Sequence, residues 1–502
     1  MIISQVSMPS LAVLDWVVII IYIFGMLCIG WHYNRKNRTQ EDYLLGGRRM
    51  NPIAVGISLF ATLLSTLSYL AYPGEMLKYG PGIFVGMLAF PLVYFVAGWW
   101  LIPRIRKMNV TSAYEILENK LGVKVRMLGT FMFLALRFFW MGTIIYVTVD
   151  IALMSVIPID RSYVPLIGIA MIVITIIYTV MGGLKAVVVT DVVQAAIFLG
   201  GAFLSIIVVV VSLGSVAALI PESWPSHWNA PKLGFDLQER ITFGNAMLML
   251  FVWYIATIGS DQMAVQRYIS TKDLRTARQS LRVSLLTDFI AKCILAFVGL
   301  AMLAYFSHND ELLLPGKSLG EQADTLFPRF ILVGLPQGIS GLVIAGLLAA
   351  AMSSISSGLN SVSSVISEDL INRFRKRKLD EHGKLSQVKS LTFGAGVVVM
   401  LFSLLIGYVP GSLYDVIMKV VNLLVCPLFV LFFMALFVPK ATENGTFIGG
   451  VFAVVVAIAI AYFGLFGITV LWIAPSSFIA GVAVSLATSR LERLLIKSRN
   501  IG

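Results

Sequence analysis

The chain has 502 residues, of which 58% are hydrophobic and only 13% are charged, roughly half the charged share of a soluble domain. Its mean hydropathy is +0.88. These figures exclude an ordinary soluble globular protein, a disordered chain and a fibrous repeat. The apolar residues fall in blocks of about 20, the length of a helix that crosses a bilayer, without the strict alternation of a membrane barrel. The sequence therefore predicts an all-α integral membrane protein embedded in the lipid bilayer.

Positive charge is concentrated in one set of connections between the apolar blocks. The net charge is +12, and 29 of the 38 Lys and Arg residues fall in alternate connections and the C-terminal tail, against six in the other connections. Cytoplasmic loops of membrane proteins are enriched in Lys and Arg. This split predicts a multi-pass cell-membrane protein with its N-terminus outside and its C-terminus in the cytoplasm. Topology thus explains the charge, and no nucleic-acid partner is expected.

The apolar blocks predict 13 transmembrane helices and no soluble domain. Their expected positions are residues 11–31, 52–76, 81–102, 127–153, 163–181, 187–214, 243–265, 284–306, 338–366, 389–408, 412–438, 446–465 and 468–488. The two longest connections, 215–242 and 307–337, lie on the outer side in this topology. They are expected to form short irregular or amphipathic caps.

The predicted span 338–366 is rich in serine. Four of its hydroxyls fall within an arc of about 160° on a helix. They belong to Ser353, Ser354, Ser356 and Ser357. Small hydroxyls serve close helix packing, but hydroxyl oxygens are also suitable ligands for a hard cation. Composition alone leaves both interpretations open.

Asp191 lies about one turn inside the predicted span 187–214. An unpaired carboxylate at that depth is unfavourable. Lys185 is six residues away, on a poor face of the helix for pairing. A bound cation is therefore the favoured partner for this carboxylate.

Two predicted spans contain features that interrupt helices. Span 52–76 has a cluster of hydroxyls followed by Pro73 and Gly74, and span 243–265 has a weak point between Thr257 and Asp261. Transporters use helices broken at mid-membrane, whose freed carbonyls bind ions and whose ends face the substrate. Because these two spans each begin a group of five, their positions predict an inverted repeat.

No arrangement typical of an enzyme is found in the sequence. The four histidines lie in loops or at span edges without metal-ligand spacing, and no Walker-type phosphate-binding loop is present. We therefore expect a carrier or channel driven by a gradient. A channel is disfavoured because no selectivity filter or ring of charges is visible. A membrane sensor is disfavoured because no soluble signalling domain is found.

Five motifs, in order along the chain, carry a resemblance to a known family. They are Asp42-Tyr-Leu-Leu-Gly-Gly-Arg48, Val110-Thr-Ser-Ala-Tyr114-Glu115, Gly182-Gly-Leu with Thr190-Asp191-Val-Val-Gln194, Asp261-Gln262 with Gln266-Arg267-Tyr268, and Ala345-Gly-Leu-Leu-Ala-Ala-Ala-Met-Ser353-Ser354 with Leu359-Asn360-Ser361. With these motifs the chain resembles the sodium:solute symporters, the family of sodium-coupled sugar, sialic acid, proline, iodide and vitamin carriers. The resemblance covers nearly the whole chain. It implies a leucine-transporter-like fold with a five-plus-five inverted repeat and 13 helices.

The resemblance also implies where sodium binds. A first Na⁺ site would use the backbone carbonyls of Ala61, Leu64 and Ala350 and the hydroxyls of Ser353 and Ser354. Some members have a second site, formed by an aspartate and further hydroxyls. Its counterparts in this chain are Asp191, Ser356 and Ser357, with Ser353 as a candidate shared ligand. Two Na⁺ ions per substrate are the resulting hypothesis.

The substrate is expected near mid-membrane, between the second, third, seventh, eighth and eleventh spans. Candidate contacts are Ser65, Ser68, Tyr69, Arg137, Tyr254 and Lys292. Lys292 falls where sugar-carrying members contact sugar, although an ion pair with Asp288 one turn earlier is also open. Arg137 lies about one turn from the carboxylate-binding arginine of the sialic acid carriers. A pair between Arg137 and Asp150 or a backbone carbonyl is the alternative.

The position-by-position resemblance does not favour a galactose site. Tyr254 and Thr257 stand where galactose carriers have Asn and Tyr, and Ser68 stands where they have Gln. The resemblance thus implies a sodium-coupled secondary active symporter that imports a small organic anion or sugar acid by alternating access. A sodium-coupled carrier of a neutral sugar and a proton-coupled symporter of the same fold are the alternatives. The transport unit is expected to be a monomer.

The whole chain is interpreted as a single transmembrane transporter domain, 1–502. Its expected parts are a peripheral first helix and cytoplasmic loop (1–51), a first inverted repeat (52–214), a second inverted repeat (243–438), and two peripheral helices with a cytoplasmic tail (439–502).

Overall fold

The computed structural model describes residues 11–154, 156, 160–375, 379–405 and 412–499. Within these ranges the ordered elements are helices, and the β-bridge between Met50 and Thr271 is isolated. The predicted outer N-terminus and the end of the predicted span 389–408 lie outside the described residues. The prediction of an all-helical membrane protein is confirmed.

The long helices make up most of the described chain. They are α1 (Val13–Asn34), α8 (Val123–Tyr146), α9 (Val164–Leu213), α10 (Phe243–Ser260), α12 (Leu274–His308), α14 (Ile339–Val365), α16 (Glu381–Leu405), α17 (Leu413–Phe437), α18 (Glu443–Phe463) and α19 (Ile473–Arg499). The shorter α-helices are α2 (Gln40–Leu45), α3 (Pro52–Leu63), α4 (Thr66–Tyr79), α5 (Phe90–Val96), α6 (Ile102–Arg106), α7 (Glu115–Lys120), α11 (Gln262–Ile269), α13 (Leu319–Val333) and α15 (Asn372–Phe374). Short 3₁₀ or π segments extend or join several of them, as η2 (Pro81–Ala89) and η3 (Ala97–Leu101) do around α5.

Eleven helices of the described chain are long and apolar enough to cross a membrane, and one further pair of bent helices passes the same test together. The eleven include a composite of η2, α5, η3 and α6, which is apolar throughout but irregular in its winding. Length and hydropathy thus support the predicted class of polytopic protein.

The bent pair is α3 and α4, which meet at an angle of 69°. Leu64 and Ser65 leave the helical region, with ψ angles of 120° and 175°. The sequence placed helix-breaking features at Pro73 and Gly74, but both lie inside α4. The break instead falls among the hydroxyl residues, at Leu64 and Ser65, and the next hydroxyl, that of Thr66, donates to the Leu347 carbonyl of α14 at 2.7 Å.

Helix α9 is 50 residues long and is interrupted at Gly183, where φ is 58° and ψ is −160°. Such backbone angles suit glycine, and a Cβ at this position would lie 2.7 Å from the Tyr43 backbone oxygen. The sequence predicted two spans, 163–181 and 187–214, over the same stretch. The irregular residue lies in the interval between them.

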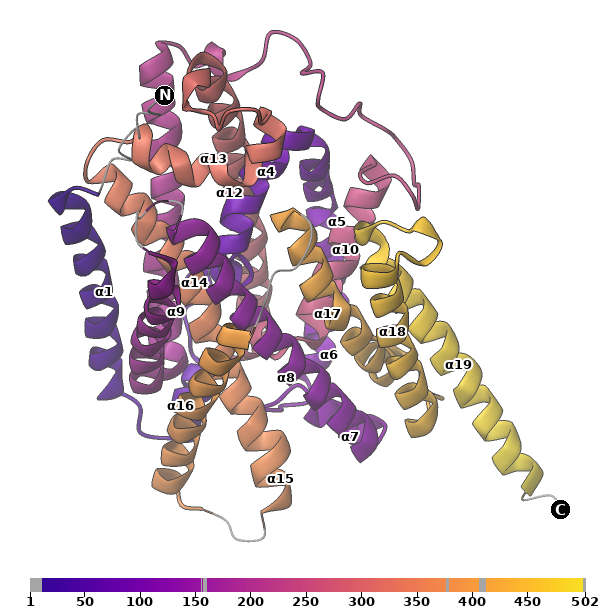
Figure 1. The fold of residues 1–502 in the computed structure, drawn as a ribbon. Coiled ribbons are helices and arrows are strands. Elements are labelled where there is room, and N and C mark those ends of the chain that lie inside the picture. The colour runs from indigo at the N-terminus through magenta and orange to yellow at the C-terminus, as the bar shows by residue number, and fades with distance from the viewer. Residues whose placement is uncertain (1–10, 155, 157–159, 376–378, 406–411, 500–502) are drawn as a thin grey trace.

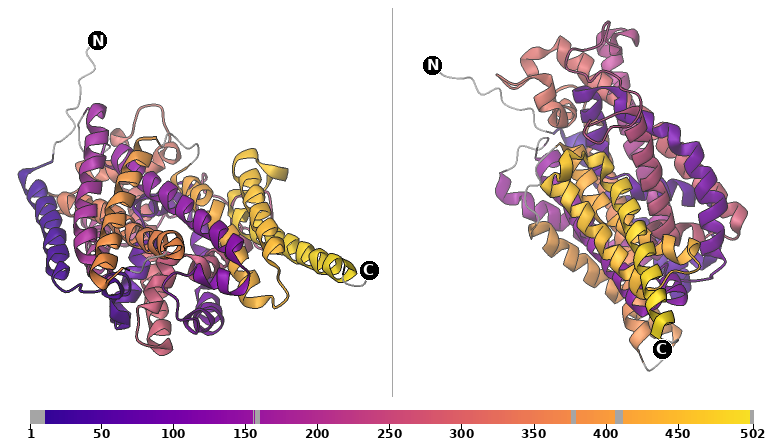
Figure 2. Two further views of the ribbon diagram at one scale, coloured as in Figure 1. Left: turned by 90° about the horizontal axis from the view of Figure 1, so that it is seen from below. Right: turned by 90° about the vertical axis from the view of Figure 1, so that its right-hand side faces the viewer.

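Helix α14 runs through the centre of the molecule (Figure 1). Every residue from Ala349 to Val365 is buried, and α14 packs against α9, α1, α8 and α3. Helix α1 lies at one edge of the bundle, while α18 and α19 pack together at the opposite edge (Figures 1 and 2). The serine-rich helix is therefore surrounded by protein, which removes its hydroxyls from lipid.

The two long connections that the sequence placed outside differ in structure. Residues 215–242 are mainly irregular, with one short turn, η6 (Ala217–Leu219), whereas 307–337 contains the helix α13. Helix α13 packs against α4 and α12. One of the two connections thus forms an irregular segment and the other a helix, which packs against α4 of the bent pair.

Candidate functional site

Two serine hydroxyls of α14 face the break between α3 and α4. Ser353 Oγ donates to the carbonyl oxygens of Ala61 and Ala350, at 3.0 and 3.1 Å. Ser354 Oγ lies 3.1 Å from the Thr62 carbonyl oxygen and 3.4 Å from that of Leu64. All five residues of the first predicted sodium site are therefore brought together, and each is buried.

The oxygen atoms at this break are of a kind that suits a hard cation. Because Leu64 and Ser65 are extended, carbonyls at the end of α3 are released from helical hydrogen bonds. The Ser65 hydroxyl is buried beside them without a hydrogen-bond partner. Neutral carbonyl and hydroxyl oxygens from two helices are suitable ligands for a hard monovalent ion.

Asp191 on α9 lies in a second polar cluster behind the break. Its Oδ2 accepts hydrogen bonds from Ser58 at 2.5 Å and Ser357 at 3.4 Å, and lies 3.1 Å from the Arg267 guanidinium. Arg267 also donates to the Ser357 hydroxyl. The hydroxyl of Ser356 points elsewhere, to the Ser353 carbonyl at 3.1 Å. Two of the three predicted residues of the second site thus meet, together with a cation of the protein itself.

The cation beside Asp191 is the principal feature that the sequence interpretation missed. Lys185 pairs with Asp42 at 3.1 Å, in agreement with its poor position for Asp191. Arg267 was counted among the positive residues of a cytoplasmic loop, yet its side chain is completely buried. It is therefore not a loop charge. One oxygen of the carboxylate, Asp191 Oδ1, has no hydrogen-bond partner.

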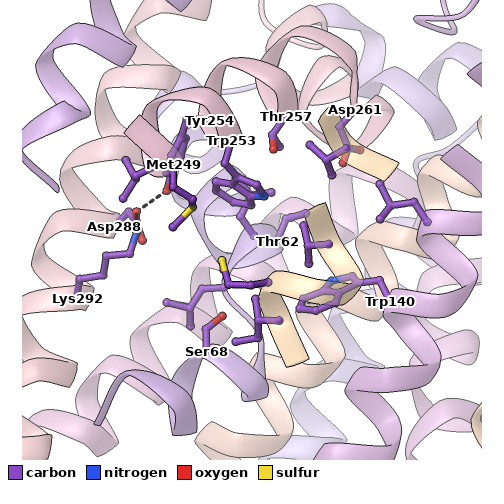
Figure 3. Close-up of a pocket in the computed structure, with 18 of the residues that line it drawn as sticks. Thr62, Ser68, Trp140, Met249, Trp253, Tyr254, Thr257, Asp261, Asp288 and Lys292 are labelled. Carbon is purple, nitrogen blue, oxygen red and sulfur yellow. Dashed lines mark hydrogen bonds and ion pairs between the residues drawn. The ribbon is translucent and has the colours of Figure 1, made fainter. Parts of the chain in front are cut away.

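A cavity lies beside the same break (Figure 3). It encloses about 830 Å³ of empty space including its opening to solvent. Four of the six substrate candidates line it: Ser68, Arg137, Tyr254 and Lys292. Its apolar wall includes Trp140, Trp253, Met249, Met418 and Val421. The cavity thus joins α4, α8, α10, α12 and α17 around one space.

Ser65 and Tyr69, the other two candidates, do not line this cavity. The Tyr69 hydroxyl donates to the Phe198 carbonyl at 2.9 Å, and its ring packs against Phe198 and Phe327. Tyr69 is therefore a packing residue in this arrangement. Ser65 lies at the helix break, beside the carbonyls described above.

Each pole of the cavity carries a buried ion pair. Arg137 on α8 pairs with Asp261, which also caps α11 by accepting from the Met263 N–H at 2.9 Å. Lys292 pairs with Asp288 at 2.6 Å within α12. Figure 3 shows Asp261 and the Asp288–Lys292 pair on opposite sides, with Trp253 and Met249 between them. The formal charges of the four residues cancel.

The two pairs differ in how fully they are satisfied. Asp288 also accepts a hydrogen bond from the Tyr254 hydroxyl, and the Lys292 ammonium lies 5.0 to 5.6 Å from the ring centres of Tyr72, Phe90 and Tyr254. Arg137, in contrast, has a buried Nε without a hydrogen-bond partner. The sequence left Asp288 open as a partner of Lys292, which the structure confirms. It proposed Asp150 or a carbonyl for Arg137, but the partner is Asp261.

A further ion pair lies at the C-terminal end of α4. Arg240 contacts both carboxylate oxygens of Glu75, at 2.7 and 2.8 Å, and reaches Asp415 on α17 at 3.4 Å. Burial opposes the charge of Arg240, but these carboxylates outweigh it and raise its pKa above the usual range. The contact connects the bent pair, the 215–242 connection and α17 above the cavity.

The fold and this site together define a class of protein: a helical membrane transporter with a broken helix beside a central cavity. The chain belongs to the sodium:solute symporter family, whose sequence model matches residues 43–453. The resemblance read from the five motifs is thereby confirmed. The protein is a sodium-coupled transporter and not an enzyme.

Individual relatives match along most of their length. The chain is 29% identical over 460 residues to the sodium/sialic acid symporter SiaT of Proteus mirabilis, covering 89% of this chain and 90% of the relative. It is 30% identical over 475 residues to the sodium/sialic acid symporter NanT of Aliivibrio fischeri, covering 92% and 88%. A solved structure of a substrate-bound, outward-open Na⁺-coupled sialic acid symporter matches with a TM-score of 0.80 and 26% identity, covering 96% and 98%.

Proposed function

We propose that this protein imports a small organic anion, such as a sugar acid, together with Na⁺, and that the anion binds in the central cavity. The observation that carries this proposal is the Arg137 guanidinium, which lines the cavity, is 5% exposed and has an unpartnered Nε. A buried guanidinium with free donors suits a carboxylate. The relatives named above carry sialic acid, a sugar acid, and support the same class of substrate.

The first Na⁺ is proposed to bind at the break between α3 and α4, held by Ala61, Leu64, Ala350, Ser353 and Ser354. The convergence of their oxygens supports this assignment. A second Na⁺ is proposed at Asp191, Ser356 and Ser357. There, the unpartnered Asp191 Oδ1 supports an ion, while Arg267 competes for the same carboxylate. The second ion therefore requires a small shift of Arg267 or of the Ser356 hydroxyl.

Thirteen crossings are proposed, with the N-terminus outside and the C-terminus in the cytoplasm. At 1.5 Å per residue α9 is about 75 Å long, more than twice the hydrocarbon thickness of a bilayer. Its two arms, 164–182 and 184–213, therefore count as two crossings and the bent pair α3–α4 as one. The corresponding breaks in α3–α4 and at Asp261 support the five-plus-five repeat over 52–214 and 243–438.

Alternating access then follows from the position of the break. Na⁺ entering from outside would tie α3 and α4 to α14, which fixes the wall of the cavity to which the substrate binds. Substrate affinity rises by linkage, because each ligand stabilises the arrangement that the other needs. Rocking of the bundle would release both ligands to the cytoplasm, from a transport unit that is a monomer.

The test is thermal stability of the purified protein with a panel of sugar acids, monocarboxylates, neutral sugars and amino acids, in NaCl and in choline chloride. A ligand present at 100 times its dissociation constant adds about 2.7 kcal/mol to the free energy of unfolding. We expect stabilisation by a carboxylate compound in NaCl only. Stabilisation that ignores sodium would contradict the ion sites and favour proton coupling.

A sodium-coupled carrier of neutral sugar is the second candidate, because both cations of the cavity already have carboxylate partners. A hydroxyl-rich solute would bind to these intact pairs without displacing either one. In that case the same panel gives sodium-dependent stabilisation by neutral sugars and none by their acids.

A further inference from the structure

A second cavity lies where three loops meet beside the end of α6. Helix α6 is in the lower half of Figure 1. The cavity encloses about 460 Å³ including its opening, and most of its lining is polar. The loop before α3 contributes Arg48, the end of α6 contributes Arg106, and the turn after α11 contributes Lys272. Three cationic side chains therefore converge on one space, far from the residues that line the central cavity.

These cations are only partly neutralised. Arg48 Nε pairs with Glu41 at 2.9 Å, on the exposed side. Arg106 donates to the backbone oxygens of Tyr268 and Thr271, at 2.5 and 3.1 Å, which fixes the guanidinium. Asp273, which follows Lys272 in the chain, is close enough to offset part of the charge of both Arg106 and Lys272 without forming an ion pair with either. Within the described ranges, no carboxylate lies within 4.0 Å of Arg106 or Lys272. The lining thus carries an excess of positive charge.

The walls of this cavity are held in place by contacts between the loops. The Met50 N–H donates to the Ser270 carbonyl at 3.1 Å, and Arg48 donates to the Val110 carbonyl at 3.3 Å. Arg48 and Asn109 have φ angles of 55° and 47°, and among the described residues only one other non-glycine residue has a positive φ. Unfavourable backbone angles that persist in a tied loop are typical of functional sites.

We propose that this cavity binds a phosphate-bearing anion. Guanidinium groups with free N–H donors recognise phosphate oxygens through paired hydrogen bonds, and a lysine adds a point charge. Arg48 retains both hydrogens of one terminal nitrogen, and Arg106 retains its Nε–H. The source is either the headgroup of an anionic phospholipid or free phosphate on the proposed cytoplasmic side.

The position of the cavity gives such binding a consequence for transport. The loop that carries Arg48 leads into α3, and the turn that carries Lys272 follows α11. These are the inner ends of both interrupted helices, α3–α4 and α10–α11. An anion that bridges the two loops would tie the ends of the two interrupted helices to each other.

The experiment compares two single substitutions in the full-length purified protein. Lys272→Gln removes one cation from the cavity, whereas Lys107→Gln removes an exposed cation next to Arg106 that does not line it. Binding of inorganic phosphate is measured by equilibrium dialysis at constant ionic strength. Retention of phosphatidylglycerol against phosphatidylcholine is measured by native mass spectrometry after delipidation.

We expect Lys272→Gln to weaken binding of the preferred probe roughly tenfold, since one charge-assisted contact is lost. Lys107→Gln should leave it within about twofold, and Lys272→Arg should retain it. Retention of phosphatidylglycerol without phosphate binding identifies a lipid headgroup, and the reverse identifies free phosphate. Equal effects of the two glutamine substitutions, or no binding of either probe to the parent protein, overturn the proposal. These readouts do not depend on the transported substrate, so the proposed function can fail separately.

Discussion

The two interrupted helices of this protein differ in the chemical groups that surround their breaks. At the first break, Leu64 and Ser65 are extended and neutral hydroxyls of α14 approach the freed carbonyls. At the second, Asp261 alone is extended, and its carboxylate both caps α11 and pairs with Arg137. A break that collects neutral oxygens offers a place for a cation. The second break, which carries the Arg137–Asp261 ion pair, can make a charged contact with a solute.

Because of this difference, substitutions at the two breaks should affect different properties, namely folding stability at one and ion binding at the other. At the first break the serine hydroxyls donate to the carbonyl oxygens. Loss of one hydroxyl there should weaken the proposed ion site but leaves no buried charge. The pair at the second break is buried at the wall of the cavity, and removal of one partner leaves the other charge unpaired. Substitutions at the second break should therefore affect folding most, and those at the first break should affect sodium most.

The largest effect is expected for Asp261→Asn. Asparagine keeps the cap of α11 but leaves the buried Arg137 without a counter-charge. We expect the free energy of unfolding to fall by about 3–5 kcal/mol, measured by thermal or denaturant unfolding in detergent. Arg137→Gln should be destabilising in the same way.

The double variant Arg137→Gln with Asp261→Asn is the control for this comparison. Because both charges are then absent, it should recover a substantial part of the lost stability. Additive losses would show that the two residues act independently and that the pair does not hold the second break.

Ser354→Ala should have the next largest effect, on sodium rather than on folding. Its hydroxyl lies beside the Thr62 and Leu64 carbonyls. Loss of a ligand to a charged ion is worth about 1.5 kcal/mol or more, so the sodium concentration for half-maximal stabilisation should rise roughly tenfold. The measurement is a sodium titration of thermal stability with choline replacement.

Ser363→Ala provides a matched control on the same helix. Ser363 is buried, but its hydroxyl bonds only to the Asn360 carbonyl within α14, at 2.9 Å. Sodium dependence should remain that of the parent protein. A tenfold change in both variants would indicate a general effect on α14, and no change in Ser354→Ala would remove the first break as a sodium site.

Asp288→Asn tests whether the solute is charged. It removes the carboxylate partner of Lys292 and leaves a net positive charge in the cavity. An anionic substrate should then bind about threefold to tenfold more tightly, because a cation in a poorly solvated space attracts it. A neutral sugar should gain nothing and should lose any contact that it makes with the carboxylate. Isothermal titration of the compound found in the stability panel distinguishes these outcomes.

The sequence predicted the class of fold from local patterns, whereas the residues expected at the first break came from the family resemblance. Apolar blocks, loop charge and the run of serines in α14 are readable without knowledge of packing. Partners across helices are not, since spacing along the chain does not reveal which helix lies opposite. Arg267 was therefore read as a loop charge, and the partnership of Arg137 with Asp261 was missed although both residues had been singled out.

The smallest expected effect concerns the packing of α13 against α4 and depends on pH. Asp324 on α13 lies against α4, where a Cβ on Gly74 would be 2.6 Å from its Oδ1. Burial raises the pKa of this carboxyl, opposed by the Leu413 N–H and by Lys78. The folded state therefore holds the proton more tightly than the unfolded state, and ionisation of Asp324 reduces stability as the pH rises from about 3.9 through the raised pKa.

Asp324→Asn removes this penalty and keeps an oxygen that can accept from the Leu413 N–H. Its stability relative to the parent protein should thus increase between pH 4 and pH 7, by less than about 1 kcal/mol, because the side chain is partly exposed. Asp310→Asn, at an exposed position on the same side, controls for the loss of an outer carboxylate. A variant that is less stable than its parent at pH 7 but not at pH 4 would show that the charge of Asp324 supports α4. Helix α4 would then also depend on an ionised group, as the second break does.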